Sequence, residues 1–345
     1  MSGQQVTVNG KKIKVVGGLL NLRNLGLKDL NLIHGLESIN DLRLVDLSSN
    51  ELTKIPFHKS FINIEVLNLR NNKISTVSGL DKYTNLRMFS LSRNKIKSLR
   101  ELGSFSHVVA ACMAYNFLES TEGIKRLGNI KVLNLSSNRL KDASELKSLT
   151  SLVELNLSAN SLSGLKGINN LKNLEILWVD DNNLSSLKEI SELSNLTILN
   201  ARWNNITEIT EIQSLTKLRS LRLSYNYITD ISPVSKLSNL NNIYAGYNNI
   251  SDISGIKTMK GLRTLQLFGN KITQCPPLNS LLNLNVLNLS NNDLKVSPRL
   301  DKAVKLTEIN LDMNPLKITS VNPPKITGNL TIKGNISGVE IKKTR

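Results

Sequence analysis

The chain has 345 residues, of which 40% are hydrophobic and only 4% aromatic, so its core must be built from aliphatic side chains. The 44 Lys and Arg residues outnumber the 27 Asp and Glu residues, and the net charge of +17 favours acidic partners such as nucleic acid or anionic membranes. Two cysteines, Cys112 and Cys275, are too few for the disulfide framework of a small secreted domain or for a metal cluster.

The N-terminal residues lack the uninterrupted apolar run of a secretory signal. No stretch of the sequence approaches the roughly 18 apolar residues that a membrane span requires. The low cysteine content fits a reducing compartment. We therefore expect an intracellular protein, cytoplasmic, nuclear or both, with no membrane partner.

The first predicted element is a β-hairpin. Asn9 and Gly10 separate the segments QQVTV and KKIKV, and Asn-Gly favours the two-residue turn that matches the twist of paired strands. Leu20 to Leu32 then reads as a degenerate coil, with Lys28 or Leu30 at the position where later coils carry asparagine. We predict that residues 1–41 form an N-terminal cap from these two elements.

The phrase L-x-x-L-x-L-x-x-N-x-L then recurs every 22 residues through residues 42–320. Its asparagine recurs thirteen times without a slip, at positions 50, 72, 94, 116, 138, 160, 182, 204, 226, 248, 270, 292 and 314. This period and phrase are the signature of leucine-rich repeats. The predicted fold class is therefore an α/β solenoid, a leucine-rich-repeat horseshoe with a parallel β-sheet on its concave side, formed by residues 1–345 as one domain.

Within one repeat the apolar residues change their spacing. Leu221 and Leu223 alternate with polar residues, which is typical of a short strand with one buried face. After the asparagine, Ile228, Ile231 and Val234 are three residues apart, and this spacing favours 3₁₀ or extended turns on the convex side over α-helices. The asparagine amide offers both a donor and an acceptor to backbone groups in a buried turn, so we assign it a structural role.

The last predicted element is a C-terminal cap at residues 321–345. The segment NLTIKGNISGVEIKK reads as short strands broken by Gly334 and Gly338. The end of a repeat stack would otherwise expose its apolar core. We therefore predict a β-type cap.

Few residues indicate chemistry. Of the three histidines, His34, His58 and His107, only His58 falls in an apolar core series, where a satisfied core histidine is the better interpretation. Cys275 occupies the position that Ile231 fills in a neighbouring coil and is expected to be a small buried hydrophobic residue. The sequence has no glycine-rich phosphate loop, zinc-ligand spacing or nucleophile elbow. We predict no enzymatic activity, no cofactor and no metal.

The variable strand positions of the later coils carry Trp, Tyr and Arg with interspersed acids, the residue types enriched in protein-binding hot spots. An alternative is that these rings only pack sideways on neighbouring coils, and it bears most on the two rings beside the asparagine, at positions 203 and 225. The candidate partner-binding residues are Trp178, Asp180, Asp181, Arg202, Trp203, Arg222, Tyr225, Tyr244, Tyr247 and Phe268.

Charge on this face bears on the class of partner. A nucleic-acid groove should present a continuous cationic stripe, whereas here the charges nearly cancel, so nucleic acid is the less favoured partner, bound through the basic edges. The cations are Arg43, Arg70, Arg87, Arg93, Lys131, Arg202, Arg219, Arg222 and Arg263, and the anions are Asp46, Glu65, Glu154, Glu175, Asp180, Asp181, Glu308 and Asp312.

The phrases NNISDISGIKTMKGLRTLQLFGNKI and NYITDISPVSKLSNL resemble two groups of 22-residue leucine-rich-repeat proteins, over about residues 20 to 320. Resemblance to the regulatory subunit of protein phosphatase 1 implies a serine/threonine phosphatase catalytic subunit as partner. Resemblance to the bacterial internalins implies an adhesin. The leading interpretation is a non-catalytic scaffold that binds a globular protein on its concave face. The alternatives are a basic module associated with RNA or ribonucleoprotein, and an internalin-like adhesin.

Overall fold

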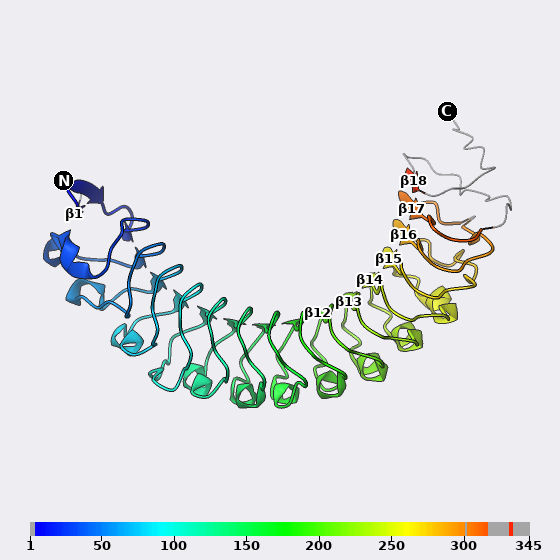
Figure 1. Ribbon diagram of the computed structural model, residues 1–345, viewed down its shortest axis with the longest axis horizontal. Coiled ribbons are helices and arrows are strands. Elements are labelled where there is room, and N and C mark those ends of the chain that lie inside the picture. The colour runs from blue at the N-terminus through cyan, green and yellow to red at the C-terminus, as the bar shows by residue number, and fades with distance from the viewer. Residues whose placement is uncertain (1–3, 301, 317–330, 334–345) are drawn as a thin grey trace. The chain divides into compact units, whose positions relative to one another are not determined.

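The computed structural model describes residues 4–300, 302–316 and 331–333. The chain forms two compact units, unit 1 (Met1–Leu174) and unit 2 (Glu175–Arg345). In each unit the chain winds into coils, with one short strand per coil on one side and turns or 3₁₀ helices on the other (Figure 1). The predicted division into a cap at 1–41, repeats at 42–320 and a cap at 321–345 stays a prediction. Of the C-terminal cap, only Thr331–Lys333 lies within the described residues.

Apart from the N-terminal hairpin and the strand that pairs with it, the strands of each unit follow one another in chain order and are all parallel. In unit 1 they are β3 (Leu19–Asn21), β5 (Leu44–Asp46), β6 (Val66–Asn68), β7 (Met88–Ser90), β8 (Ala110–Cys112), β9 (Val132–Asn134) and β10 (Glu154–Asn156). In unit 2 they are β11 (Ile176–Trp178), β12 (Ile198–Asn200), β13 (Ser220–Arg222), β14 (Asn242–Tyr244), β15 (Thr264–Gln266), β16 (Val286–Asn288), β17 (Glu308–Asn310) and β18 (Thr331–Lys333).

Every helix among the described residues is a 3₁₀ helix, which confirms the prediction from the three-residue spacing of Ile228, Ile231 and Val234. Unit 1 has η1 (Leu30–Leu32), η2 (Leu36–Ser38), η3 (Lys59–Phe61), η4 (Leu80–Lys82), η5 (Ile124–Leu127), η6 (Ser144–Ser148) and η7 (Ile168–Asn170). Unit 2 has η8 (Lys188–Ile190), η9 (Thr210–Ser214), η10 (Ser232–Lys236) and η11 (Ser254–Thr258).

The core of each coil is a set of aliphatic side chains stacked on the same set in the next coil. In the coil of β13, Leu221, Leu223 and Ile228 are fully buried, whereas Ser220 and Arg222 reach solvent. Each such buried side chain contributes about 1.5–3 kcal/mol relative to an exposed one. The strand alternation therefore sends every second residue outward, where it is free to vary.

The repeated asparagine joins neighbouring coils. The Asn94 carbonyl oxygen accepts a hydrogen bond from the Ile74 N–H at 2.9 Å. Its amide nitrogen donates to the carbonyl oxygens of Leu69 and Leu91, at 2.9 and 3.0 Å. Asn226 makes the same three bonds in unit 2. One side chain thus satisfies three backbone groups, and the predicted structural role is confirmed.

The N-terminal hairpin lies where the Asn-Gly pair predicts it. Strands β1 (Gln5–Val8) and β2 (Lys11–Lys14) pair antiparallel around Asn9 and Gly10, which both have positive φ angles. Strand β1 also pairs with β4 (Ile33–His34) of the first coil.

The degenerate first coil corrects one expectation. The pairing of β3 with β5 aligns Leu25, and neither Lys28 nor Leu30, with Asn50. Leu25 cannot supply an amide, so the Asn50 carbonyl oxygen accepts from the N–H groups of both Leu25 and Leu27, each at 3.0 Å. Sequence spacing missed this position because the first coil is longer than the 22-residue repeat.

Candidate functional site

The outward side chains of the coils form a surface that we call the strand face. In each coil it comprises the exposed strand residues and the two residues just before the asparagine. In the coil of β13 these are Ser220, Arg222, Ser224 and Tyr225. Because the coils stack in register, equivalent positions of successive coils form columns along each unit.

The residue immediately before each asparagine has a positive φ angle of about the same value in every coil. Residues other than glycine adopt this left-handed conformation at a cost of roughly 1–2 kcal/mol. We call this set the turn column, and it comprises Ser49, Asn71, Arg93, Tyr115, Ser137, Ala159, Asp181, Trp203, Tyr225, Tyr247, Gly269, Asn291 and Met313.

Three consecutive members of the turn column in unit 2 are aromatic and stack on one another. The ring centroids of Trp203 and Tyr225 are 3.7 Å apart with their planes within 6° of parallel. Tyr225 stacks in turn on Tyr247 at 4.6 Å. At the end of this series the Tyr247 ring contacts the Phe268 ring in a T-shaped arrangement, with the two ring centroids 5.2 Å apart. We call these four residues the aromatic ladder.

The aromatic ladder stays open to solvent although its rings pack on each other. Trp203 is 52% exposed and Tyr247 is 44% exposed, while Tyr225 between them is half-buried. The alternative of sideways packing therefore describes the geometry of Trp203 and Tyr225, but it does not remove them from the surface. Aromatic rings exposed in a fixed arrangement lose little conformational entropy on binding.

Two glycines accommodate the end of the ladder. A Cβ at Gly246 would lie 2.7 Å from the Phe268 ring, and a Cβ at Gly269 would lie 2.7 Å from the Tyr247 ring. These contacts are closer than van der Waals packing allows, so the two rings occupy space that only glycine leaves open. Neither glycine could be recognised from the sequence as part of the site, because a glycine carries no ring or charge that would mark it.

The remaining candidate residues surround the ladder in unit 2. Arg222 is exposed, and its guanidinium lies 5.1 Å from the centroid of the Tyr244 ring, within range of a cation–π interaction. Asp180 accepts a hydrogen bond of 2.8 Å from the amide of Asn200, a residue that sequence reasoning missed.

The structure places Trp178 at the end of β11, half-buried and without a ring contact among the described residues. Arg202 is half-buried and Asp181 is exposed. The ten candidates therefore form one ring-stacked group of four and one arginine–tyrosine pair, with Arg202 beside Trp203 in the chain and with Trp178 and the two aspartates together in the coil of β11.

Two residues differ from their predicted roles. His58 is half-buried instead of in the core, because its Nδ1 accepts a hydrogen bond from the Ser60 N–H at 3.2 Å and so caps η3. Cys275 is also only half-buried, although burial raises the pKa of its thiol to about 12. The Cys112 sulfur, at the end of β8, lies 2.9 Å from the Ser92 hydroxyl.

Among the described residues, no group of three or more His, Cys, Asp or Glu side chains could hold a metal ion. In the same part of the chain no helix has the length and apolar character needed to cross a membrane.

The family model for Leucine Rich repeats (2 copies) matches the chain at residues 41–82, 128–167, 194–236, 216–258 and 238–280. No curated protein sequence matches the chain.

Solved structures resemble the chain more extensively. An internalin (inlF) from Listeria monocytogenes is 28% identical with a TM-score of 0.79, over 87% of each chain. A leucine-rich-repeat protein of Leptospira interrogans is 26% identical with a TM-score of 0.66, over 86% of this chain and 90% of that one. Internalin C2 from Listeria monocytogenes is 32% identical with a TM-score of 0.50, over 52% of this chain and 79% of that one.

None of these comparisons supports identity with the phosphatase regulatory subunit, whereas the likeness to internalins is supported. Together with the repeated phrase, the parallel strands and the asparagine bonds, they confirm the predicted fold class, a leucine-rich-repeat solenoid. The chain belongs to the leucine-rich-repeat family.

Proposed function

We propose that the protein is a non-catalytic scaffold that binds a globular protein partner through the strand face of unit 2. The observation that carries this proposal is the aromatic ladder, in which Trp203, Tyr225 and Tyr247 are stacked and still open to solvent. Leucine-rich-repeat proteins generally act as protein-interaction scaffolds, which supports a binding role without chemistry.

The chemistry around the ladder also supports a protein partner. Arg222 and Tyr244 add a cation and a polar ring beside it, and Asp180 adds a carboxylate held by Asn200. Tryptophan, tyrosine and arginine side chains dominate binding energy in protein interfaces, each contributing about 2 kcal/mol or more at a hot spot. A ring that is already stacked has less freedom to lose when a partner covers it.

The test uses three forms of the protein as affinity baits in nuclease-treated cell lysate. The ladder variant is Trp203→Ala/Tyr247→Ala. The control variant is Tyr227→Ala/Phe117→Ala, which removes two exposed rings from the position just after the asparagine, outside the strand face. We expect a partner that the wild type and the control recover and the ladder variant loses.

The recovered partner is then purified and titrated into each form. The ladder variant should bind about 100-fold more weakly, since the loss of two hot-spot rings costs several kcal/mol. A second pair, Trp178→Ala/Tyr244→Ala, measures how far the binding surface extends beyond the ladder. If the ladder variant and the control bound the partner with equal affinity, the aromatic ladder would not be part of the interface.

The identity of the partner is a further part of the proposal. A serine/threonine phosphatase catalytic subunit, which the resemblance implies, is the first partner to titrate. A partner that the wild type recovers from untreated lysate but not from nuclease-treated lysate would favour the RNA-associated alternative, which the net charge of +17 supports.

A second candidate function is an internalin-like adhesin, and the internalin structure with a TM-score of 0.79 favours it. We propose an intracellular location, cytoplasmic or nuclear, for the scaffold, and location separates the two functions. Protease treatment of intact cells should leave an intracellular scaffold uncut, whereas an adhesin would be digested.

A further inference from the structure

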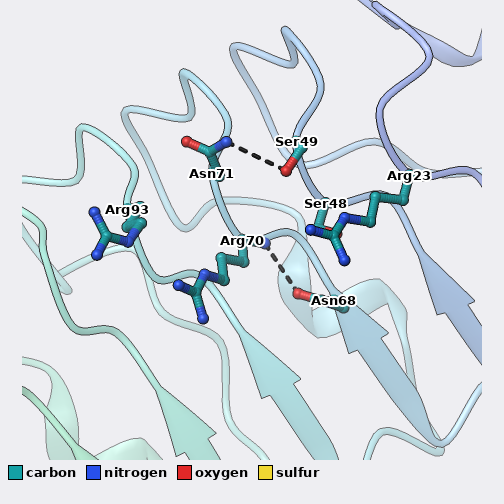
Figure 2. A pocket seen from close by; sticks show the side chains of 7 residues that line it. All are labelled: Arg23, Ser48, Ser49, Asn68, Arg70, Asn71 and Arg93. Carbon is teal, nitrogen blue, oxygen red and sulfur yellow. Dashed lines mark hydrogen bonds between the residues drawn. The ribbon is translucent and has the colours of Figure 1, made fainter.

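A basic hollow lies on the strand face of unit 1. It is lined by other residues than the aromatic ladder, which belongs to unit 2. It has a volume of about 520 Å³. Figure 2 shows the side chains that line it, which come from consecutive coils and include no carboxylate. They include Arg23, Arg70, Arg93, Ser48, Ser49 and Asn71.

The position of the hollow follows from the columns of the strand face. The pairing of β3, β5 and β6 places Arg23, Ser48 and Arg70 at equivalent positions of three successive coils. Two arginines thus stand two coils apart, roughly 10 Å at the usual strand spacing, with a serine between them. Because Ser48 is small and buried, it leaves open the space between the two guanidinium groups.

The third arginine of the hollow, Arg93, packs against an aromatic ring. Arg93 lies in the turn column one coil after Arg70, and its guanidinium is 4.3 Å from the centroid of the Tyr115 ring. Stacking on a ring occupies the face of a guanidinium and leaves its in-plane N–H donors available. Arg93 can therefore donate to a group in the hollow without losing its contact with Tyr115.

The three arginines have no ion-pair partner among the described residues. The ion pairs in that part of the chain join Lys73 to Glu51 and Arg100 to Glu122. Asp46, in the same coil as Ser48, accepts a hydrogen bond of 2.8 Å from the Ser48 N–H. Three cations around one hollow repel one another, and an anion bound between them would relieve that repulsion.

Polar donors complete the lining. Asn71 donates its amide to the Ser49 hydroxyl at 3.2 Å, which holds both side chains at the rim and leaves the hydroxyl proton of Ser49 able to donate. Among the described residues the Ser48 hydroxyl has no hydrogen-bond partner. Guanidinium forks with hydroxyl donors beside them match the terminal oxygens of a phosphate group.

We propose that this hollow is a binding site for a phosphate monoester, carried by a phosphorylated serine or threonine of a protein. A phosphate monoester brings two charges and three terminal oxygens to three guanidinium groups, whereas a carboxylate brings one charge and two oxygens. The hollow is also larger than a phosphate group alone, so it has room for the side chain that carries it. The site is independent of the aromatic ladder.

The observations favour a phosphorylated protein over nucleic acid. A nucleic acid needs a run of cations along the coils. Here the turn column continues after Arg93 and Tyr115 with Ser137 and Ala159, and the column of Arg70 continues with Ser92, Ala114 and Ser136. The basic patch is therefore local.

The test measures fluorescence anisotropy of a fluorescein-labelled peptide in which one phosphoserine is flanked by glycine and alanine. The same peptide with serine is the ligand control. Wild-type protein should bind the phosphopeptide at least about tenfold more tightly than the serine peptide. No preference for the phosphopeptide would overturn the proposal.

Two matched variants locate the site. Arg70→Gln/Arg93→Gln removes two charges from the hollow, and Arg219→Gln/Arg263→Gln removes two exposed charges from unit 2, at the residues just before β13 and β15. The first pair should raise the Kd for the phosphopeptide at least about tenfold, and the second should change it less than twofold. Equal weakening by both pairs would reduce the binding to net charge and contradict a site.

A competition experiment distinguishes the source of the phosphate. A single-stranded oligouridylate and vesicles containing phosphatidylinositol phosphate are each added at equal phosphate concentration. The phosphopeptide should remain bound. If either competitor displaces it and loses its own binding in Arg70→Gln/Arg93→Gln, the protein source is wrong and the site belongs to nucleic acid or to lipid. Circular dichroism and melting temperature of both variants should match the wild type, so loss of binding cannot arise from unfolding.

Discussion

The strand faces of unit 1 and unit 2 use the same backbone positions for different chemistry. In both, the residue before the asparagine has a positive φ angle and the asparagine satisfies the same backbone groups. The side chains differ completely, with Ser49, Asn71 and Arg93 lining the basic hollow of unit 1 and Trp203, Tyr225 and Tyr247 forming the ladder of unit 2.

This comparison shows that one set of repeat residues holds the coil while another set varies, and we expect recognition to depend on the second set. The inward leucines and the asparagine hold the coil, and their environment is the same in each unit. The outward positions contribute little to the core and can carry charge in one unit and rings in the other. The experiments below test how complete this separation is, from the largest expected effect to the smallest.

Removal of the asparagine should destabilise both units equally. Asn94→Ala in unit 1 and Asn226→Ala in unit 2 each leave one buried N–H group without a partner and remove one of the two asparagine amides that donate to each of two carbonyl oxygens, at an expected cost of about 3 kcal/mol. Urea unfolding followed by circular dichroism measures the loss. Asn85→Ala, which removes an exposed amide that bonds only to Asn63, is the control and should cost under about 0.5 kcal/mol. A large difference between the two buried sites would contradict an equivalent scaffold.

Exchange of the turn column should change recognition more than stability. The triple variant Trp203→Ser/Tyr225→Asn/Tyr247→Arg gives unit 2 the residues of unit 1. It loses two stacked contacts, each worth about 0.5–1.5 kcal/mol, so the free energy of unfolding should fall by about 1–3 kcal/mol with an unchanged circular dichroism spectrum. Loss of the strand signal would show instead that the rings are needed for folding.

The stacked pair itself should show a measurable coupling energy. In a double-mutant cycle with Trp203→Ala and Tyr225→Ala, we expect a coupling of about 1 kcal/mol from urea unfolding. The pair Trp203 and Tyr227 serves for comparison, because Tyr227 is exposed and lies outside the ladder. Coupling of the same size in both pairs would mean that the aromatic ladder is not a distinct unit.

The Cys275 thiol of unit 2 should react slowly while the protein is folded. Since burial raises the pKa of Cys275 to about 12, its thiol stays protonated in the folded protein at neutral pH and is a poor nucleophile. In Cys112→Ser, a thiol reagent at pH 8 should label Cys275 at least about tenfold more slowly than after unfolding in urea. Equal rates before and after unfolding would exclude this environment.

The same pKa shift sets a direction for stability against pH. The folded state holds the Cys275 proton more tightly than the unfolded state, so its contribution is fully present below pH about 9 and is lost as the pH rises toward about 12. Comparison of Cys275→Ala with the wild type should show a smaller decrease in stability over that alkaline range in the variant. A steeper decrease in the variant would contradict the assigned shift.

Most of the fold could be predicted because each repeat position packs against the same position in the coils before and after it. The spacing of Leu221, Leu223 and Ile228 was enough to place strand, core and 3₁₀ turn. Where the period breaks, prediction failed. The first coil puts Leu25 at the asparagine position, and the coil of η3 uses His58 as a cap instead of a core residue.

The candidate site was predicted as a set of residue types without its contacts. The rings at positions 203, 225 and 247 were identified from their place in the repeat, yet their stacking depends on the left-handed backbone that carries them. The basic hollow was not identified at all, since Arg70 and Arg93 were only counted among the charges of the face.

The sequence alone determined the period, the alternation of inward and outward residues and the asparagine column, because these depend on local spacing and on backbone groups that every coil shares. The tertiary structure decided which outward side chains meet. That outcome depends on the size of the residue between them: a serine at position 48 leaves a hollow between two arginines, and a glycine at position 246 lets the Phe268 ring lie over the neighbouring coil. Volume across coils, more than any motif along the chain, distinguishes the two faces.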